Sequence, residues 1–213
     1  MITPAATQSS LASRLWYRCC KLFCWTACKF LFRYRYRGAK HVPLAGPVLL
    51  ASNHQSHLDP VLVGVACPRQ MKAMARHTLF FWPLSWLIRS LGAVPVNREQ
   101  GAIGGVKATL KMLKDGEAVL LFPEGTRTRD GALQFLMPGF CALARRSEAT
   151  IVPVTIDGGF RALPRGAFFP RRTDVTIVFS PPIRPDEYNR LSDVELVELV
   201  RSQIARRLER IGS

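Results

Sequence analysis

Five short apolar runs, separated by segments of helical periodicity, constrain the fold of this chain more than any other feature. The runs have the length of strands and occupy residues 48–52, 93–96, 118–122, 151–156 and 175–179. Helical patterns lie between them at 60–67, 103–114 and 140–147. Alternation of this kind indicates strands of a parallel sheet connected by helices. We therefore predict an α/β fold with a largely parallel central sheet flanked by helices.

The C-terminal helix carries the clearest local signals. Ser192 and Glu195 have the spacing of a capping box, and Leu191 and Leu196 have that of a hydrophobic staple. An apolar stripe follows at helical spacing, formed by Val197, Val200, Ile204, Leu208 and Ile211. We expect this helix to cover one face of the sheet, because its apolar stripe needs a partner.

His54 and Asp59 stand five positions apart, just after the first apolar run. On a continuous helix their side chains would lie about 140° apart, so they can meet only if the backbone turns between them. Asp59 followed by Pro60 is typical of a helix start, which favours such a turn. An imidazole held by a carboxylate can remove a proton from an alcohol. The structural alternative is that Asp59 caps the helix, alone or in a capping box with Ser56.

A second polar segment directly follows the run at 118–122. It contains Glu124, Gly125, Thr126 and Arg127. The glycine permits close approach of the backbone, and the arginine offers a planar fork of donors suited to phosphate oxygens. This segment predicts a phosphate-binding turn, and a surface turn with a solvated arginine is the alternative. Arg98 follows another apolar run and is open to the same two interpretations.

In this order, the segments resemble the four sequence blocks of the glycerolipid acyltransferases, the family of 1-acylglycerol-3-phosphate acyltransferases. The blocks lie at residues 53–59, 92–98, 122–127 and 151–154, within a resemblance that extends over roughly residues 46–182. The resemblance implies that His54 is the general base for the acceptor hydroxyl and that Asp59 is its partner. It further implies that the phosphate-bearing acceptor is held by Arg98, Glu124, Gly125, Thr126 and Arg127.

The resemblance also implies the reaction. A fatty acyl group would pass from acyl-CoA or acyl carrier protein to the free hydroxyl of 1-acylglycerol-3-phosphate, giving phosphatidic acid. We expect no cofactor besides the acyl donor and no metal. Many family members carry a lysine before the glycine that follows the third block, whereas this chain has Pro138 before Gly139. Either Arg129, Arg161 or Arg165 replaces that cation, or the acceptor is another lysolipid, such as a lyso-ornithine lipid.

The charge of the chain indicates anionic partners. Thirty Lys and Arg residues face fifteen Asp and Glu residues, which gives a formal charge of +15, and no acidic residue precedes Asp59. One face of an N-terminal helix would carry Arg14, Arg18, Lys21, Trp25 and Lys29. The other would carry Leu15, Cys19, Leu22, Phe23, Thr26, Ala27 and Phe30. This pattern is typical of a helix in a membrane interface, and a helix docked on its own domain is the alternative.

The N-terminal segment has no apolar stretch long enough to cross a bilayer. A span needs roughly 20 apolar residues, and the longest uncharged stretch between residues 14 and 37 is 22–28. We therefore predict a basic, amphipathic, membrane-anchoring helical segment at 1–40 and an acyltransferase domain at 41–213. The expected location is monotopic, on the cytoplasmic face of a membrane. The aromatic-rich residues 79–88 are either a second lipid-facing segment or part of the core.

The remaining residue types narrow the function further. Six cysteines lack metal-binding or disulfide spacing, and reduced thiols on the cytosolic side are the simplest interpretation. The expected partners are an anionic membrane surface, a lysophospholipid acceptor and the acyl donor, with no nucleic acid. A basic, non-enzymatic module that binds membranes or nucleic acid is the alternative from another functional class. The spacing of His54 and Asp59 argues against it.

Overall fold

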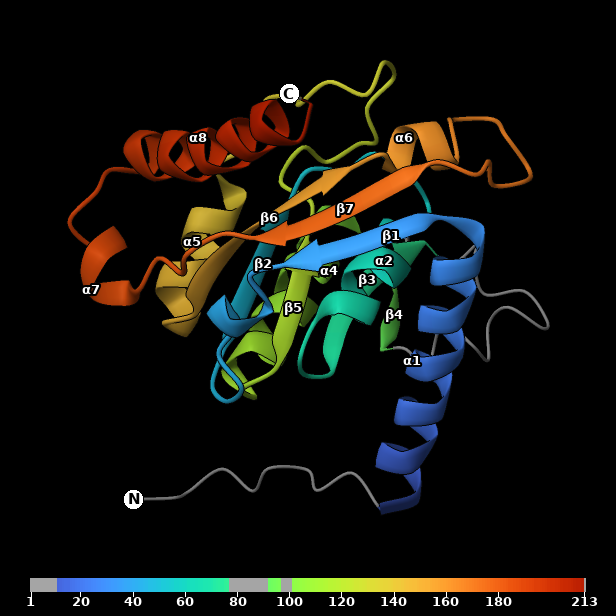
Figure 1. The fold of residues 1–213 in the computed structure, drawn as a ribbon. Helices are drawn as coiled ribbons and strands as arrows, with labels where there is room; N and C mark the ends of the chain where they lie inside the picture. The colour runs from blue at the N-terminus through green and yellow to red at the C-terminus, as the bar shows by residue number, and fades with distance from the viewer. Residues whose placement is uncertain (1–10, 77–91, 97–100, 213) are drawn as a thin grey trace.

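The computed structural model describes residues 11–76, 92–96 and 101–212. Within these residues, seven strands form one sheet of order β1-β7-β6-β2-β5-β3-β4 (Figure 1). The strands are β1 Arg33–Arg37, β2 Val48–Ser52, β3 Met71–Arg76, β4 Ala93–Val96, β5 Ala118–Leu121, β6 Thr150–Asp157 and β7 Asp174–Phe179. The helices are α1 Leu11–Leu31, η1 Ala39–His41, α2 Asp59–Ala66, α4 Gly101–Lys114, α5 Gly139–Ser147, α6 Gly159–Ala162, α7 Pro185–Tyr188 and α8 Asp193–Gly212.

The sheet is largely parallel, as predicted. Neighbouring strands run parallel except for β6 and β7, which pair antiparallel. All five predicted strands are present, and the structure adds β1 and β3. Residues 33–37 were expected in a helical N-terminal segment, and this was wrong: they form β1, which pairs with β7. The buried Tyr34 explains the placement, because its hydroxyl donates to the Leu62 carbonyl of α2 at 2.6 Å.

Helices cover both faces of the sheet (Figure 1). On one face α1 and α2 pack over a core that includes Val48, Leu50 and Val152. On the other face α4, α5 and α8 pack over Leu49 and Ile151. Alternate residues of β2 therefore point to opposite cores, as the pleat of a strand requires. The predicted position of the C-terminal helix is confirmed, since α8 contacts β6.

The predicted capping box begins α8. The Ser192 backbone amide donates to Glu195 Oε2 at 2.7 Å, and the Glu195 amide donates to Ser192 Oγ at 3.3 Å. Each side chain thus accepts a hydrogen bond from the backbone amide of the other residue. These bonds fix where the helix starts and hence which residues face the sheet.

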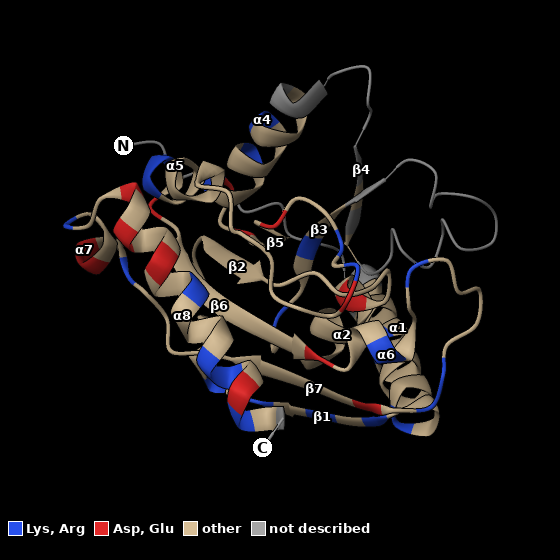
Figure 2. Cartoon of the chain, turned by 90° about the horizontal axis from the view of Figure 1, so that it is seen from above, with Lys and Arg blue, Asp and Glu red and all other residues tan. Residues whose placement is uncertain are grey.

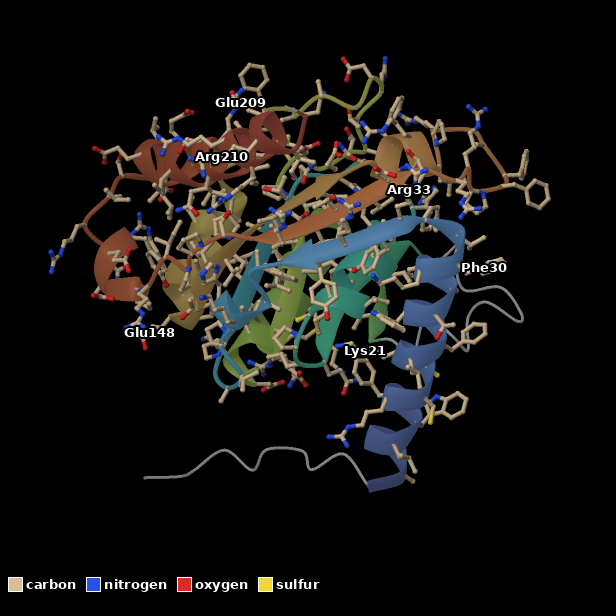
Figure 3. All side chains as sticks on the ribbon, viewed as in Figure 1. Lys21, Phe30, Arg33, Glu148, Glu209 and Arg210 are labelled. Carbon is tan, nitrogen blue, oxygen red and sulfur yellow. The ribbon has the colours of Figure 1, made fainter. Side chains whose placement is uncertain are left out.

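The N-terminal helix α1 has a third face, which packs against the domain, besides the basic and apolar faces predicted from the sequence. Tyr17, Cys20, Cys24 and Cys28 are buried, and α1 contacts α2 and β1. Lys21 also faces the domain, where its Nζ donates to the Cys67 carbonyl (Figure 3). The face predicted to be apolar and outward stays exposed, including Leu22, Phe23 and Phe30. No helix among the described residues is long and apolar enough to cross a membrane.

Candidate active site

The candidate site lies where parallel strands β2, β5 and β6 end. Asn53, the first residue after β2, ties two of these ends together. Its Nδ2 donates to the Ile156 carbonyl at 2.9 Å, and its Oδ1 accepts from the Ile156 amide at 2.8 Å. Because Ile156 belongs to β6, this buried amide fixes the backbone immediately before His54 to the neighbouring strand.

His54 and Asp59 are in contact. The distance from His54 Nδ1 to Asp59 Oδ2 is 2.8 Å. The same oxygen accepts from the backbone amides of Gln55 at 2.6 Å and Ser56 at 2.8 Å. One carboxylate oxygen therefore closes the turn that the sequence required and orients the imidazole. The predicted capping role is different in detail: Leu58 is the N-cap residue of α2, and Asp59 is its first helical residue.

The two side chains of this pair have different surroundings. Asp59 is completely buried, whereas the His54 side chain is 18% exposed. Burial raises the pKa of Asp59, and the hydrogen bond from His54 and the two backbone amides oppose that rise. Asp59 Oδ2 already accepts from two backbone amides, so toward the neutral imidazole of His54 it acts as an acceptor and the ring proton lies on Nδ1. In that tautomer the second ring nitrogen is the one that can accept a proton.

The chain packs closely around His54. Its ring stacks on Phe122 with centroids 3.8 Å apart. Its backbone amide donates to Glu124 Oε1 at 3.3 Å, and its carbonyl accepts from the Thr128 amide at 2.9 Å. The segment after β5 therefore supports the histidine through one ring contact and two backbone hydrogen bonds.

Glu124 is a buried acid next to the histidine. Burial raises its pKa from 4.5 to about 7, although hydrogen bonds from the backbone amides of His54 and Gln134 oppose the rise. Its second oxygen, Oε2, is buried and has no hydrogen-bond partner. This carboxyl group is therefore poised to exchange a proton near neutral pH, a property found often in functional sites.

Gly125 makes the turn that follows. It has φ of +71°, and its amide donates to the Phe122 carbonyl at 3.0 Å. A Cβ at this position would meet the flexible methyl end of Met137. The positive φ is what favours glycine here.

A pocket of about 370 Å³ opens beside His54. Its lining includes Phe122, Gly125, Thr126, Arg127 and Arg165. Three of the predicted substrate-binding residues thus line the same pocket as the histidine. Glu124, also predicted to bind substrate, is not among the lining residues and instead accepts from the His54 amide. Arg98 lies outside the described residues, as do residues 79–88.

The structure adds neighbours that the sequence did not single out. Gln55 links the site to two distant segments: its Nε2 donates to the Gly131 carbonyl at 3.2 Å, and its Oε1 accepts from the Phe160 amide at 3.2 Å. At Gly159 a Cβ would come within 2.9 Å of Asp59 Oδ1, so a small residue leaves room for the carboxylate. The signal available in the sequence was a run of polar residues after an apolar strand. Their partners lie about 100 positions away and could not be read from spacing.

A search for clusters of three or more possible metal ligands found none in the described part of the chain.

The fold and the site define a class of enzyme. The acyltransferase family model matches residues 33–157, which is more than half of the chain. The chain belongs to the acyltransferase family. Its matched region contains the predicted His54, Asp59, Glu124 and Arg127.

Several relatives carry a more specific name. The 1-acyl-sn-glycerol-3-phosphate acyltransferase of Bacillus subtilis is 33% identical over 144 residues, covering 64% of this chain and 70% of the relative. The enzyme of the same name from Borreliella burgdorferi is 28% identical over 180 residues, covering 82% and 71%. The chloroplastic LPAT1 of Arabidopsis thaliana is 29% identical over 140 residues, covering 64% of this chain and 39% of the relative.

The fold has a counterpart of known structure. The crystal structure of the 1-acyl-sn-glycerophosphate (LPA) acyltransferase PlsC from Thermotoga maritima superposes with a TM-score of 0.81 at 22% identity, covering 98% of this chain and 86% of that chain. The plant relatives are longer: the match spans 39% of Arabidopsis LPAT1 and 47% of Brassica napus BAT2.

Proposed function

We propose that this chain transfers a fatty acyl group from a thioester, carried by coenzyme A or acyl carrier protein, to the free hydroxyl of 1-acylglycerol-3-phosphate. The observation that carries the proposal is the His54–Asp59 pair at a pocket that also contains Arg127. A base and a phosphate-binding cation are the two features that this acceptor requires. The names of the bacterial and plant relatives support the same acceptor.

The geometry suggests the order of events. Asp59 holds the proton on Nδ1 of His54, so the other ring nitrogen takes the proton of the acceptor hydroxyl as the oxygen attacks the thioester carbonyl. The carbon–sulfur bond then breaks, and the thiolate takes the proton from the imidazolium. The carboxylate stabilises the imidazolium between these steps, and general-base catalysis of this kind contributes about 10²- to 10⁴-fold. The products are phosphatidic acid and a free thiol.

Arg165 favours a phosphate-bearing acceptor over a lyso-ornithine lipid. The chain lacks a cation at Pro138, and Arg165 lines the same pocket as Arg127. Two guanidinium groups at one pocket suit the charge of a phosphate monoester. Arg165 is therefore the replacement for the missing lysine that the geometry supports best among Arg129, Arg161 and Arg165.

We further propose that the enzyme works at an anionic membrane surface on the cytoplasmic side, without nucleic acid as a partner. The exposed face of α1 supports this, because Leu15, Leu22, Phe23 and Phe30 lie outside the domain contact. A helix with such a face lies in a lipid interface at a depth set by its apolar residues. The docked cysteine face holds the same helix against the domain.

An acyl-transfer assay over a panel of lysolipids tests the proposal. The parent chain should acylate 1-acylglycerol-3-phosphate faster than lyso-ornithine lipid, and His54→Ala should lower turnover by about 10²- to 10⁴-fold. His57→Ala is the matched control, because His57 lies in the same loop and lines the same pocket, whereas the bond to Asp59 Oδ2 is made by His54. Equal loss in the two variants would contradict the assignment of His54 as the base.

A further inference from the structure

The loop between α6 and β7, residues 163–173, presents two adjacent phenylalanines to solvent. Phe168 is 94% exposed and Phe169 is 83% exposed. The loop is closed at its base, where the Arg171 amide donates to the Ala162 carbonyl at 2.7 Å. Single exposed apolar residues are common on protein surfaces, whereas neighbouring ones mark a site of contact. We refer to this segment as the diphenylalanine loop.

Basic residues surround the two rings. The loop contributes the exposed Arg165, Arg171 and Arg172. Arg172 also lines a surface hollow of about 490 Å³ together with Arg33 and Arg161. Those two arginines are paired with carboxylates, Arg33 with Asp174 at 3.4 Å and Arg161 with Asp157 at 2.9 Å. The excess positive charge therefore comes from the three arginines of the loop.

The diphenylalanine loop is continuous with the exposed face of α1. The Arg33 amide at the start of β1 donates to the Thr173 carbonyl at the end of the loop at 3.1 Å. Phe30, which precedes β1 by three positions, is 82% exposed and points away from the sheet (Figure 3). Figure 2 shows basic residues on α6, on the loop and at the start of β1, beside the end of α1. Apolar and basic side chains thus share one region of the surface.

The same loop reaches the catalytic pocket, since Arg165 lines the pocket with His54. The exposed rings lie only three and four positions further along. A surface that binds the rings would therefore lie close to the catalytic pocket.

We propose that the diphenylalanine loop is a second membrane contact, in which Phe168 and Phe169 enter the bilayer and Arg171 and Arg172 bind anionic headgroups. The inference rests on the proposed function, because a lipid acceptor is what brings the pocket to a bilayer. With α1 as the first contact, two separated contacts fix the orientation of the pocket as well as its distance from the lipid. An acidic protein would use the arginines but would gain little from two apolar rings at the tip.

Flotation with vesicles of phosphatidylcholine and phosphatidylglycerol tests this directly. The double variant Phe168→Ser with Phe169→Ser should bind about 10- to 100-fold more weakly at both low and high salt, because apolar insertion is insensitive to salt. Arg171→Gln with Arg172→Gln should weaken binding about 10-fold or more at low salt and much less at about 1 M salt. Both pairs are exposed, so the variants should fold as the parent does.

Leu44→Ser is the matched control. Leu44 is 73% exposed and precedes the amino end of β2, whereas the pocket lies at the carboxyl ends of the strands. This variant should bind vesicles as the parent does. Equal loss in the Leu44 and double-phenylalanine variants would overturn the proposal. Unchanged vesicle binding of the double-phenylalanine variant would also overturn the proposal. If, in addition, the arginine variant slowed transfer only from acyl carrier protein, the surface would be assigned to contact with that protein.

An activity measurement separates this proposal from the proposed function. The ratio of transfer to a bilayer-embedded acceptor over transfer to a dissolved short-chain acceptor should fall about 10-fold or more in the double-phenylalanine variant. A parent chain that binds vesicles through the loop but transfers no acyl group would refute the proposed function and leave the membrane contact supported. A parent that transfers acyl groups with an unchanged ratio in the variant would refute the contact alone.

Discussion

Replacing Asp59 by asparagine separates the charge of this residue from its geometry. Three donors converge on Oδ2: His54 Nδ1 and the backbone amides of Gln55 and Ser56, at 2.6 to 2.8 Å. Asparagine satisfies all three only if its carbonyl oxygen takes that position. Its amide nitrogen then replaces Oδ1, which is buried without a hydrogen-bond partner. The variant therefore keeps the orientation of the imidazole and loses the charge that stabilises the imidazolium.

The size of the effect follows from these bonds. A hydrogen bond to a charged group contributes about 1.5–3 kcal/mol and a neutral one about 0.5–1.5 kcal/mol. The difference, roughly 1–2 kcal/mol, acts when the imidazolium forms, so kcat/KM should fall about 5- to 30-fold. Asp59→Ala should be worse, because it also leaves the Gln55 and Ser56 amides unpaired and the imidazole without a partner. Its loss should approach the roughly 10²- to 10⁴-fold expected for His54→Ala.

Acyl-transfer rates of the three variants, measured with saturating donor, decide the matter. Near-ultraviolet circular dichroism and a melting curve should first establish that each variant is folded. If Asp59→Asn loses as much activity as His54→Ala, the charge dominates and the geometric argument is wrong. If it transfers acyl groups as fast as the parent, the carboxylate has no part in stabilising the imidazolium.

Three further expectations follow from other contacts. The parent should lose up to roughly 3 kcal/mol of unfolding free energy between pH 4.5 and about 7, because folded Glu124 keeps a proton that the unfolded chain has released. Glu124→Gln should not show this loss. Urea unfolding at several pH values measures the difference, and the same pH dependence in both proteins would contradict the expectation. Arg127→Ala should raise the apparent KM for lysophosphatidate more than that for the acyl donor, and equal increases would assign Arg127 elsewhere. Tyr188→Phe should cost about 1–3 kcal/mol in unfolding free energy, because the buried Tyr188 hydroxyl donates toward the Ala144 and Ala149 carbonyls at 3.1 and 3.0 Å, and an unchanged urea midpoint would refute that.

The strands that the sequence predicted share one property: each is apolar on both faces. β2 shows this most clearly, with all five residues buried. β1 and β3 escaped because their patterns are mixed. In β1 arginine and tyrosine alternate, and only Tyr34 is buried, since the strand lies at the edge of the sheet. An apolar-run criterion therefore misses strands of mixed sequence, both at the edge of the sheet, as for β1, and inside it, as for β3.

The N-terminal helix shows a different limit. The sequence divided it into a basic face and an apolar face, whereas the structure has a third, built from Tyr17 and three cysteines. These four residues recur at spacings of three and four, as one helix face requires, and cysteine packs like a small apolar residue, so the sequence did contain a signal for this face. Lys21 was placed with the solvated cations, and burial against the domain instead lowers its pKa. Only tertiary contacts distinguish a cation that meets solvent from one that caps a carbonyl.

Within the site, the local part was predictable and the long-range part was not. The contact of His54 with Asp59 needed one turn, and Pro60 supplied a signal for it. The neighbours that hold this turn come from far along the chain: Ile156 binds Asn53, and Phe160 binds Gln55, across more than 100 positions. These bonds exist only because β6 pairs with β2 in one register. The register of that pairing cannot be read from a single sequence.

This division has a consequence for specificity. The dyad is held by a buried carboxylate, two backbone amides and a stacked ring, so its geometry is complete before any substrate arrives. The residues that we propose to meet the acceptor lie instead on loops that line the pocket, Arg127 after β5 and Arg165 after α6. Loops tolerate substitution better than packed strand ends do. Changes in the acceptor should therefore arise through the two loops, with the chemistry of His54 and Asp59 unchanged, and grafting an alternative loop at 163–173 should shift acceptor preference while the pH dependence of turnover stays that of the parent.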